Sequence, residues 1–419
     1  MQTRLLLVLF LCFNIPVGFS QSRQIASFSI TPERDLPTQL ISVDITGLEY
    51  SEEDILVVYT DGRTQKLPTQ FLAAASPQLW FHPGKALKSG EKYDYEIYAE
   101  DTPEAPDRFL ARKDKDHITV FSGEQEVLRY RHSLIEAPEG TNPLYRRQGA
   151  YIHPLFSPAG KTLTEIQPED HYHHYGIWNP WTRTIFEGRP VDFWNLADGQ
   201  GTVRYAGTLA TWSGPLYGGF RVHHEHIDFT APGADKTALN EIWEVGVWST
   251  EIDDRPVWVI DYVFTLNCAT DSAVMLSEYR YGGGLGFRAT DAWTRYTSTV
   301  ITSEGNTRKD ADATNARWCM MEGSTGEGMR SGVVIMSHPA NRSYPEPMRV
   351  WPEDEAGGIG YLFFEFTPIR QQEWQLLPGR EYVLQYRMIS FDGDLDKDLI
   401  DNFWYHYAYP PIVSMIKTD

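Results

Sequence analysis

The sequence has few cysteines, a small share of positive charge and few helical patterns. Three cysteines occur in 419 residues, and only Cys268 and Cys319 lie beyond the first twenty positions. The sequence leaves open whether these two form a disulfide in an oxidising compartment. No CxxC pair and no Cys/His zinc spacing exists, which excludes a zinc-finger type of site. No amphipathic helix of three or more turns is indicated before Lys397–Tyr407, so a helical bundle is excluded as well.

Acidic residues outnumber basic ones by 57 to 37, which gives a formal net charge of −20. A surface of this sign repels nucleic acid and anionic membranes, so neither is expected as a partner. An anionic substrate would require a local basic pocket.

Residues 1–20 have the three-part layout of a secretory signal. Arg4 supplies the positive start, Leu5–Phe13 is an unbroken apolar run, and small residues precede a cleavage position at Gln21. The run is too short to span a bilayer, which takes about 20 apolar residues, and no later stretch approaches that length. We expect a chain exported to the periplasm or beyond, without membrane insertion. The oligomeric state is left open.

The remainder is expected to be all-β, in two units. Residues 21–115 alternate in short runs such as Tyr93–Tyr98, separated by turns such as Asp61-Gly62, which suits a small immunoglobulin-like sandwich. Residues 116–419 continue this pattern in longer runs without blade repeats, which suits one large double-sheet sandwich. Expected strands there include 119–121, 127–130, 202–208, 219–228, 238–249, 257–266, 333–337, 361–367 and 382–389.

Aromatic residues make up 13% of the chain, with 13 tryptophans and 23 tyrosines. Flat rings stack on the C–H faces of sugars in carbohydrate-binding clefts, while their N–H or O–H groups still find partners. An aromatic-rich sandwich core is the alternative, and we expect it to account for most of these residues.

The densest polar segment is Glu165–Trp178, which reads EIQPEDHYHHYGIW. It carries His171, His173 and His174, and its proline and glycine indicate a loop, where sites on rigid sandwiches usually lie. Histidine titrates near neutrality, so each of them can serve as a general acid or base or, when neutral, as a metal ligand. The alternative is a hydrogen-bonded structural cluster.

A second histidine-rich segment, Val222–Asp228, lies on an expected strand. Side chains alternate there, so His224 and His226 share one face, and His223 and Glu225 share the other. A His-x-His pair on a strand is a common ligand arrangement, and two stacked surface histidines are the alternative.

Three weaker features complete the candidates. His153 lies between aromatic and proline residues and is a candidate for the same pocket. Glu278–Arg288 is glycine-rich but lacks the Lys-Ser/Thr ending of a phosphate loop, which excludes nucleotide binding; its Arg280 and Arg288 can hold a carboxylate or sulfate. A late loop region combines His338 with two arginines and two aromatic residues. No Gly-x-Ser-x-Gly elbow exists, so a serine hydrolase is not supported.

These segments occur in a recognisable order. They are Tyr151–Leu155, Asp170–Trp178, Val191–Trp194, Tyr281–Arg288, Ser337–Pro339 and Leu377–Asp394. In combination they resemble the secreted bacterial family named methane oxygenase PmoA-like, over nearly all of the chain after the signal. That name misleads, because a particulate methane oxygenase subunit is a multi-helix membrane protein. The resemblance implies instead a large β-sandwich similar to galactose mutarotases and some polysaccharide lyases, in bacteria that degrade complex glycans.

The loop departs from the family pattern at two positions. The family usually reads His-Pro-His-His-Arg-Gly, whereas Tyr172 and Tyr175 here replace the proline and the arginine. The histidines match. Arg183 or Arg280 can take over an anion-binding role of the missing arginine.

We expect an exported enzyme that acts on oligosaccharides, including those that contain uronic acids, either by elimination, as a lyase or a dehydratase, or by hydrolysis. Elimination needs a base, a group that stabilises the enolate, and an acid for the leaving group. The histidines can supply the base directly or hold a divalent metal, an arginine can hold the carboxylate, and a tyrosine can be the acid. Hydrolysis would use two carboxylates. A non-catalytic glycan-binding protein and a sugar mutarotase are the alternatives.

The candidate residues fall into four sets. The predicted catalytic residues are His171, His173, His174, Tyr175, Glu241 and Tyr279. The predicted substrate-binding residues are His153, Trp178, Asp192, Trp194, Arg280, Arg288, His338, Arg349 and Trp351. The predicted ligands, if a divalent metal is bound, are His173, His174 and His224. The candidate carboxylates for hydrolysis are Glu165, Asp170, Asp192 and Glu241.

Overall fold

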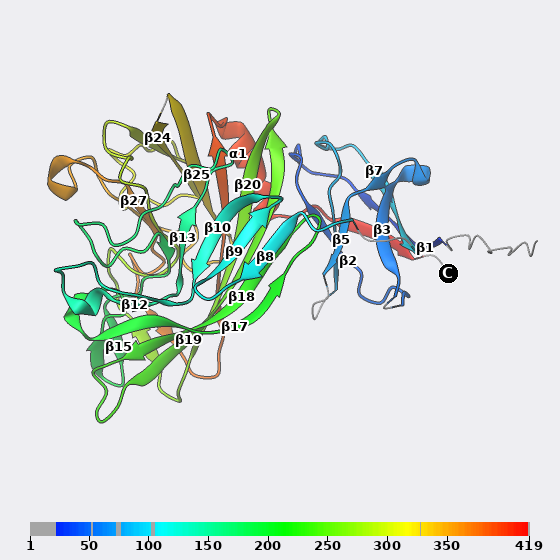
Figure 1. The fold of residues 1–419 in the computed structure, drawn as a ribbon. Helices are drawn as coiled ribbons and strands as arrows, with labels where there is room; N and C mark the ends of the chain where they lie inside the picture. Colours follow the sequence, from blue (N-terminus) through cyan, green and yellow to red (C-terminus); the bar gives the residue numbers. More distant parts are fainter. Residues whose placement is uncertain (1–21, 52, 73–76, 102–104, 327, 418–419) are drawn as a thin grey trace, which may run out of the picture.

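The computed structural model describes residues 22–51, 53–72, 77–101, 105–326 and 328–417. The predicted signal segment, 1–20, lies outside these residues. Within them the chain is all-β, as the sequence predicts, with one α-helix, α1 (Lys397–Ala408). No helix in this part of the chain is long and apolar enough to cross a membrane. Figure 1 shows a small β unit beside a larger one.

The small unit is a sandwich of two antiparallel sheets. One runs in the order β30 (Val413–Lys417), β1 (Arg23–Ile30), β7 (Tyr93–Glu100), β3 (Ile55–Thr60) and β4 (Lys66–Leu67), with the 3₁₀ turn η1 (Asp61–Arg63) after β3. The other runs in the order β2 (Ile41–Asp44), β6 (Gln78–Phe81) and β5 (Thr69–Leu72). Rings of Phe28, Phe81 and Tyr95 pack in its core. The last strand, β30, pairs with β1, so this unit holds strands from both ends of the described chain (Figure 1).

The large unit is built on two eight-stranded antiparallel sheets. Sheet A runs in the order β26 (Met348–Val350), β27 (Phe363–Phe366), β22 (Gly286–Arg288), β14 (Ile177–Trp178), β13 (Tyr151–Leu155), β10 (Gln125–Arg131), β9 (His117–Ser122) and β8 (Phe109–Lys113). Sheet B runs in the order β17 (Gly201–Trp212), β18 (Gly218–Asp228), β19 (Lys236–Ile252), β20 (Arg255–Cys268), β29 (Tyr382–Asp392), β25 (Met329–Ser337), β24 (Trp318–Gly326) and β23 (Ser298–Thr302).

Smaller elements complete the large unit. A four-stranded sheet consists of β16 (Arg189–Val191), β15 (Thr184–Phe186), β21 (Val274–Leu276) and β28 (Trp374–Leu376), and a two-stranded one of β11 (Leu134–Ile135) and β12 (Arg147–Gln148). Three 3₁₀ turns are η2 (Pro143–Tyr145), η3 (Leu196–Asp198) and η4 (Ala356–Gly358).

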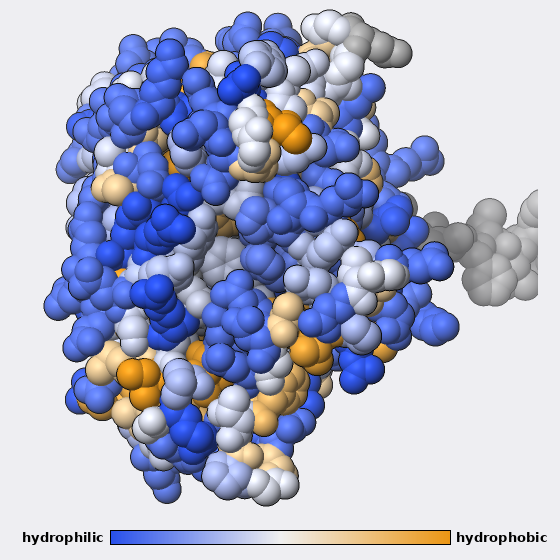
Figure 2. Space-filling model, turned by 90° about the vertical axis from the view of Figure 1, so that its left-hand side faces the viewer, coloured by the Kyte–Doolittle hydropathy of each residue, from blue (hydrophilic) through white to orange (hydrophobic). Residues whose placement is uncertain are grey.

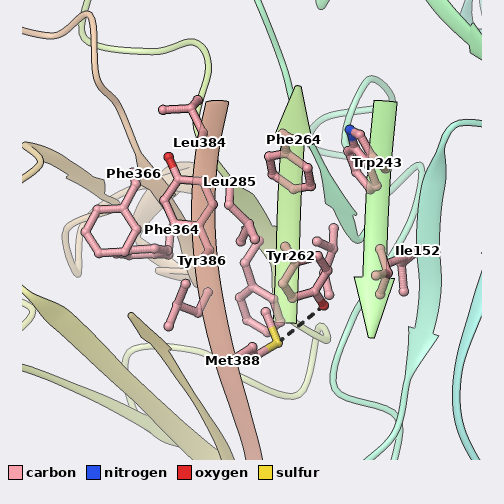
Figure 3. Close-up of a cluster of buried hydrophobic side chains, with 14 of the residues drawn as sticks. Ile152, Trp243, Tyr262, Phe264, Leu285, Phe364, Phe366, Leu384, Tyr386 and Met388 are labelled. Atoms are coloured by element: carbon pink, nitrogen blue, oxygen red, sulfur yellow. Dashed lines mark hydrogen bonds between the residues drawn. The ribbon is translucent and has the colours of Figure 1, made fainter. Parts of the chain in front are cut away.

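The main core lies between sheets A and B (Figure 3). Side chains alternate along a strand, so one face of each strand points into this core. Phe264 of β20 contacts Tyr386 of β29, and Tyr386 in turn stacks on Phe366 of sheet A with ring centroids 5.7 Å apart. Burying a side chain of this size stabilises the fold by roughly 1.5–3 kcal/mol. The stacked rings therefore join the two sheets into one sandwich.

Sheet B is covered on its second face as well. On β20, Val257 and Val259 point away from the main core and pack with Phe403 and Trp404 of α1. The helix begins after Asp396, whose side chain accepts hydrogen bonds from two N–H groups of the first turn. Central strands of sheet B are apolar on both faces for this reason, which explains the long hydrophobic runs in the sequence.

The small unit joins the large one through Gln70. Its amide nitrogen donates to the carbonyl of Tyr217, and its oxygen accepts hydrogen bonds from the N–H groups of Leu216 and Tyr217, all at 2.9 Å. Trp80 stacks on Tyr217 with ring centroids 5.5 Å apart. Because the buried amide is satisfied at both ends, the two units meet in a specific, packed interface.

Candidate active site

The outer face of sheet A carries the candidate site. Alternation along β22 and β27 sends Phe287 and Phe364 into the main core and turns Arg288 and Phe363 to the other side. A mostly aromatic hydrophobic layer covers that side, formed by Tyr151, Tyr175, Trp178, Trp194, Trp351 and Phe363 together with Leu196. The histidine-rich loop rests on this layer.

Loop 165–176, between β13 and β14, is a closed hairpin. The N–H of Gln167 donates to the carbonyl of His174 at 2.8 Å. Gly176 ends the loop with a φ of 63°, and a Cβ at that position would lie 2.4 Å from the carbonyl oxygen of Ile152. Only glycine fits there. The backbone of the loop therefore holds its three histidines in one place.

The loop forms one wall of a cavity of about 260 Å³. The described lining residues are His171, His173, His174, Thr182, Trp194, Asn195, Tyr279, Arg280, Tyr281, Trp351 and Glu355. This volume lies near the lower end of small-molecule sites, which span roughly 300–1,000 Å³. Seen from the side of β27 and β12, the surface is mostly hydrophilic and is hollowed near its centre (Figure 2).

The three histidine rings lie against one another. Their centroids are 4.8 Å apart for His171 and His174, 5.0 Å for His173 and His174, and 5.4 Å for His171 and His173. Burial, together with the adjacent His171, lowers the pKa of His173 to about 4. Burial also lowers the pKa of His174 well below its usual value. Both residues are therefore neutral at pH 7 and can take part in hydrogen bonds without carrying charge.

Lowering the pH from 6.5 toward 4 should destabilise the folded chain through His173. The unfolded residue takes up a proton near pH 6.5, whereas the folded one takes it up only near pH 4. In that interval the unfolded state binds more protons, so the free energy of unfolding falls as the pH decreases. The full shift corresponds to roughly 3 kcal/mol at most.

Chemical denaturation of the wild type and of His173→Gln at neutral and mildly acidic pH measures this effect. Because glutamine does not titrate, the variant should lose less stability than the wild type on acidification. Burial also lowers the pKa of His153 to about 4, so His153→Gln should behave in the same way. Parallel pH curves for wild type and His173→Gln would show that His173 is not held neutral.

Asp170 joins His171 to a buried arginine. One carboxylate oxygen lies 2.9 Å from Nδ1 of His171, and the other lies 2.7 Å from Nη2 of Arg288. Burial raises the pKa of Asp170, but the hydrogen bond with His171 and the charge of Arg288 outweigh it and hold the pKa below its usual value. Arg288 lies over the rings of Trp351 and Tyr361, at 5.1 and 5.3 Å. With Nδ1 donating to the carboxylate, Nε2 of His171 is left to accept a proton from a ligand.

Tyr281 supplies a second fixed polar group in the lining. Its phenol oxygen accepts hydrogen bonds from Nη2 of Arg349 at 2.9 Å and from Nε1 of Trp351 at 3.1 Å. Arg349 is buried, and it is held by Asp312 at 3.0 Å and by Glu355 at 3.5 Å. The position of the Tyr281 oxygen is therefore set by groups that are themselves anchored.

The glycine run after Tyr281 serves packing. Gly284 has a φ of 59°, and a Cβ there would lie 2.0 Å from the carbonyl oxygen of Phe366. The backbone at Gly284 therefore lies directly against β27 of sheet A, where a side chain would not fit.

The cavity brings together seven of the predicted residues. They are His171, His173, His174, Trp194, Tyr279, Arg280 and Trp351. Three more, Trp178, Arg288 and Arg349, lie behind the lining and contact His174, Asp170 and Tyr281 respectively.

Asp192 shapes the wall without lining it. One of its carboxylate oxygens accepts the N–H groups of Trp194 and Asn195, at 2.8 and 2.9 Å. The other accepts hydrogen bonds from Thr182 at 2.6 Å and from the Asn195 side chain at 2.7 Å. Asp192 therefore positions three lining residues.

Other predicted residues lie outside the cavity. Nδ1 of His153 lies 3.0 Å from the hydroxyl of Thr164. Tyr175 donates its hydroxyl proton to a backbone carbonyl of η2, and burial raises its pKa to about 12. His338 packs against Tyr407 of α1, with ring centroids 5.2 Å apart. None of these side chains lines the cavity described above.

Glu241 and His224 lie between the sheets in a fully buried polar network. Glu241 accepts hydrogen bonds from Asn179 and from Nε2 of His226, the latter at 2.9 Å. Nε2 of His224 lies 2.6 Å from the hydroxyl of Tyr130. Burial raises the pKa of Glu241, but the two neighbouring imidazoles outweigh it and hold the pKa at about 2. His224 and His226 share one face of β18, as predicted, and that face is the inner one.

The predicted three-histidine metal set is not assembled. His173 and His174 line the cavity, whereas β18 turns His224 into the core. Among the described residues, no group of three or more His, Cys, Asp or Glu side chains has the arrangement of a metal site. Cys268 and Cys319 are both free, and burial raises the pKa of each thiol.

Four lining residues are not among those predicted from the sequence. They are Thr182, Asn195, Tyr281 and Glu355. Tyr281 stands beside two candidates, Tyr279 and Arg280, but nothing local distinguishes it from its neighbours. Glu355 belongs to a run of acidic residues that is typical of an exposed loop. These residues can be assigned to the site only from the folded structure, in which they meet residues of distant strands.

The fold and site define an all-β protein with a histidine-lined cavity on the outer face of a large sandwich. The chain belongs to DUF6807, a family of unknown function whose model matches residues 117–405. No curated protein matches the chain. Among solved structures, it is similar to an α-mannosidase from Enterococcus faecalis V583, with a TM-score of 0.43 and 9% identity over 94% of this chain. The chain spans 46% of the length of that enzyme.

Proposed function

We propose that this chain is an exported enzyme that cleaves an acidic oligosaccharide by β-elimination. The proposal depends mainly on the chain of contacts from Arg288 through Asp170 to His171, which ends at the cavity. Elimination from a uronide begins with removal of the proton next to the carboxylate. His171 is suited to remove it, because the Asp170 carboxylate stabilises the imidazolium that forms.

The aromatic lining supports a carbohydrate ligand. Trp194, Trp351, Tyr279 and Tyr281 all contribute to the cavity. Flat rings of this kind stack on the apolar faces of sugars and leave the hydroxyls to polar partners. The sequence resemblance to the PmoA-like proteins, and through them to galactose-mutarotase-like sandwiches, also supports a carbohydrate ligand.

Arg280 supports a substrate that carries a carboxylate. It is an exposed cation in the lining, and no ion pair joins it to another described residue. In a chain with a net charge of −20, such an arginine offers a local site for an anion. The neutral His173 and His174 can donate N–H groups to the enolate oxygens that develop during the reaction.

Hydrolysis by two carboxylates has less support. Among the described lining residues Glu355 is the one carboxylate, and it lies 3.5 Å from Arg349. Of the candidates from the sequence, Asp170 is paired with Arg288, and Glu241 lies between the sheets. A glycosidase pair would need two carboxyl groups about 5–10 Å apart across the substrate.

His171→Gln tests the proposed base. The wild type should convert a member of a panel of uronic-acid oligosaccharides to an unsaturated product, followed by ultraviolet absorbance and mass. The variant should lose about 100-fold or more in kcat. His223→Gln is the matched control, because His223 is half-buried on β18 and bonds Asn240 outside the cavity. Full turnover by His171→Gln would overturn the assignment.

Non-catalytic glycan binding is the second candidate, favoured by the same aromatic lining. Calorimetry with the same panel distinguishes the two. Heat of binding that disappears in Trp351→Ala, with no product from the wild type, would favour the binding module. Product formation excludes it.

A further inference from the structure

The hydrogen bonds around Tyr281 leave its own proton without a protein acceptor among the described residues. Its oxygen already receives one N–H from Arg349 at 2.9 Å and one from Trp351 at 3.1 Å. A phenol group has one O–H to donate and a limited capacity to accept. With the accepting side occupied, the O–H is left to donate to a ligand in the cavity that Tyr281 lines.

The same two donors stabilise negative charge on this oxygen as the proton leaves. Arg349 is positively charged and buried, and its contacts with Asp312 and Glu355 hold it in place. Preorganised donors of this kind need not move during the reaction, so they stabilise the transition state effectively. The N–H of Trp351 adds a second, neutral donor.

We infer that Tyr281 is the catalytic acid of the site; this rests on the elimination proposed above. Nε2 of His171 takes the proton from the carbon next to the carboxylate, and the electron pair of that C–H bond forms the new double bond. The bond from the adjacent carbon to the leaving oxygen breaks, and its electron pair stays on that oxygen, which takes the proton of Tyr281. Water then returns a proton to Tyr281 and removes one from His171.

Neither of the other two candidate tyrosines is held in this way. Tyr175 donates to a backbone carbonyl of η2 and does not line the cavity. Tyr279 lines the cavity, but its ring lies under the guanidinium of Arg183 at 3.6 Å, and no hydrogen bond from a described residue reaches its hydroxyl. Tyr281 is therefore the tyrosine that the geometry prepares for proton donation.

Tyr281→Phe removes only the hydroxyl and tests the inference. On an oligosaccharide whose leaving group is a sugar hydroxyl, kcat should fall about 100-fold while KM stays within about threefold. On a uronide with 4-nitrophenolate in the same position, the loss should stay within about threefold, because that leaving group departs without a proton. Tyr279→Phe should lose far less than Tyr281→Phe on the natural leaving group.

Tyr205→Phe is the matched control, since the Tyr205 hydroxyl bonds Thr208 on β17, outside the cavity, at 2.8 Å. It should keep full turnover. An equal loss on both leaving groups, or full turnover by Tyr281→Phe, would overturn the role of Tyr281 while the loss in His171→Gln still supports elimination. A wild type that binds these sugars and turns over none of them would overturn both.

Discussion

Replacing Glu241 with alanine is expected to lower the free energy of unfolding by about 3–5 kcal/mol. The carboxylate is fully buried between the sheets and accepts hydrogen bonds from His226 and Asn179. Alanine leaves these donors without an acceptor where bulk water does not reach, and it also leaves a cavity. Denaturant titration followed by tryptophan fluorescence measures the loss.

Two variants on the same strand bracket this result. Glu244→Ala is the matched control, because Glu244 pairs with Arg221 at the surface of β19, and an exposed pair contributes under about 1 kcal/mol. Glu241→Gln keeps the shape and one acceptor oxygen, so its effect should fall between the two. Equal losses in Glu241→Ala and Glu244→Ala would show that the buried network does not support the fold.

The long strands are predictable because alternation is a local property. Runs expected over 238–249 and 257–266 are observed as Lys236–Ile252 and Arg255–Cys268, and the expected helix is α1. Strand β30 is not predicted from the sequence, because its five residues are too few to show alternation. They form a strand by pairing with β1 at the other end of the chain. The two residues of β14 are equally too few to show a period.

The histidine loop is predictable because its polar residues stand together in the sequence. Its partner Tyr281 is not, because Tyr281 comes to the same cavity as His171 only through the order of β14, β22, β27 and β26 in sheet A. Alternation also shows that His224 and His226 share a face without showing which face is buried. The inner face of β18 can carry these polar side chains because Glu241 accepts a hydrogen bond from His226.

Arg288→Met is expected to abolish turnover and to lower the free energy of unfolding by about 3–5 kcal/mol. The guanidinium side chain is 1% exposed and lies 2.7 Å from Asp170. Methionine fills a similar space but leaves the partly buried carboxylate with His171 as its remaining partner. The pKa of Asp170, which His171 and Arg288 now hold low against the effect of burial, should rise. A protonated Asp170 no longer stabilises the imidazolium of His171.

The double variant Asp170→Asn with Arg288→Met separates folding from catalysis. It contains no unpaired buried charge, so about half or more of the lost stability should return. Turnover should not return, because asparagine cannot stabilise the imidazolium. Arg330→Met, which breaks a half-exposed pair with Glu322 at 2.9 Å, is the control and should cost under about 1 kcal/mol.

The two measurements on the double variant show whether the base depends on the Asp170 carboxylate. If its stability returns and its turnover stays absent, the carboxylate acts through His171, as the geometry of the Arg288, Asp170 and His171 contacts requires. If turnover returns as well, His171 does not depend on Asp170. The turnover of His171→Gln then decides whether the proton acceptor is His171 or one of the neutral pair His173 and His174, whose rings pack against His171 in the same cavity.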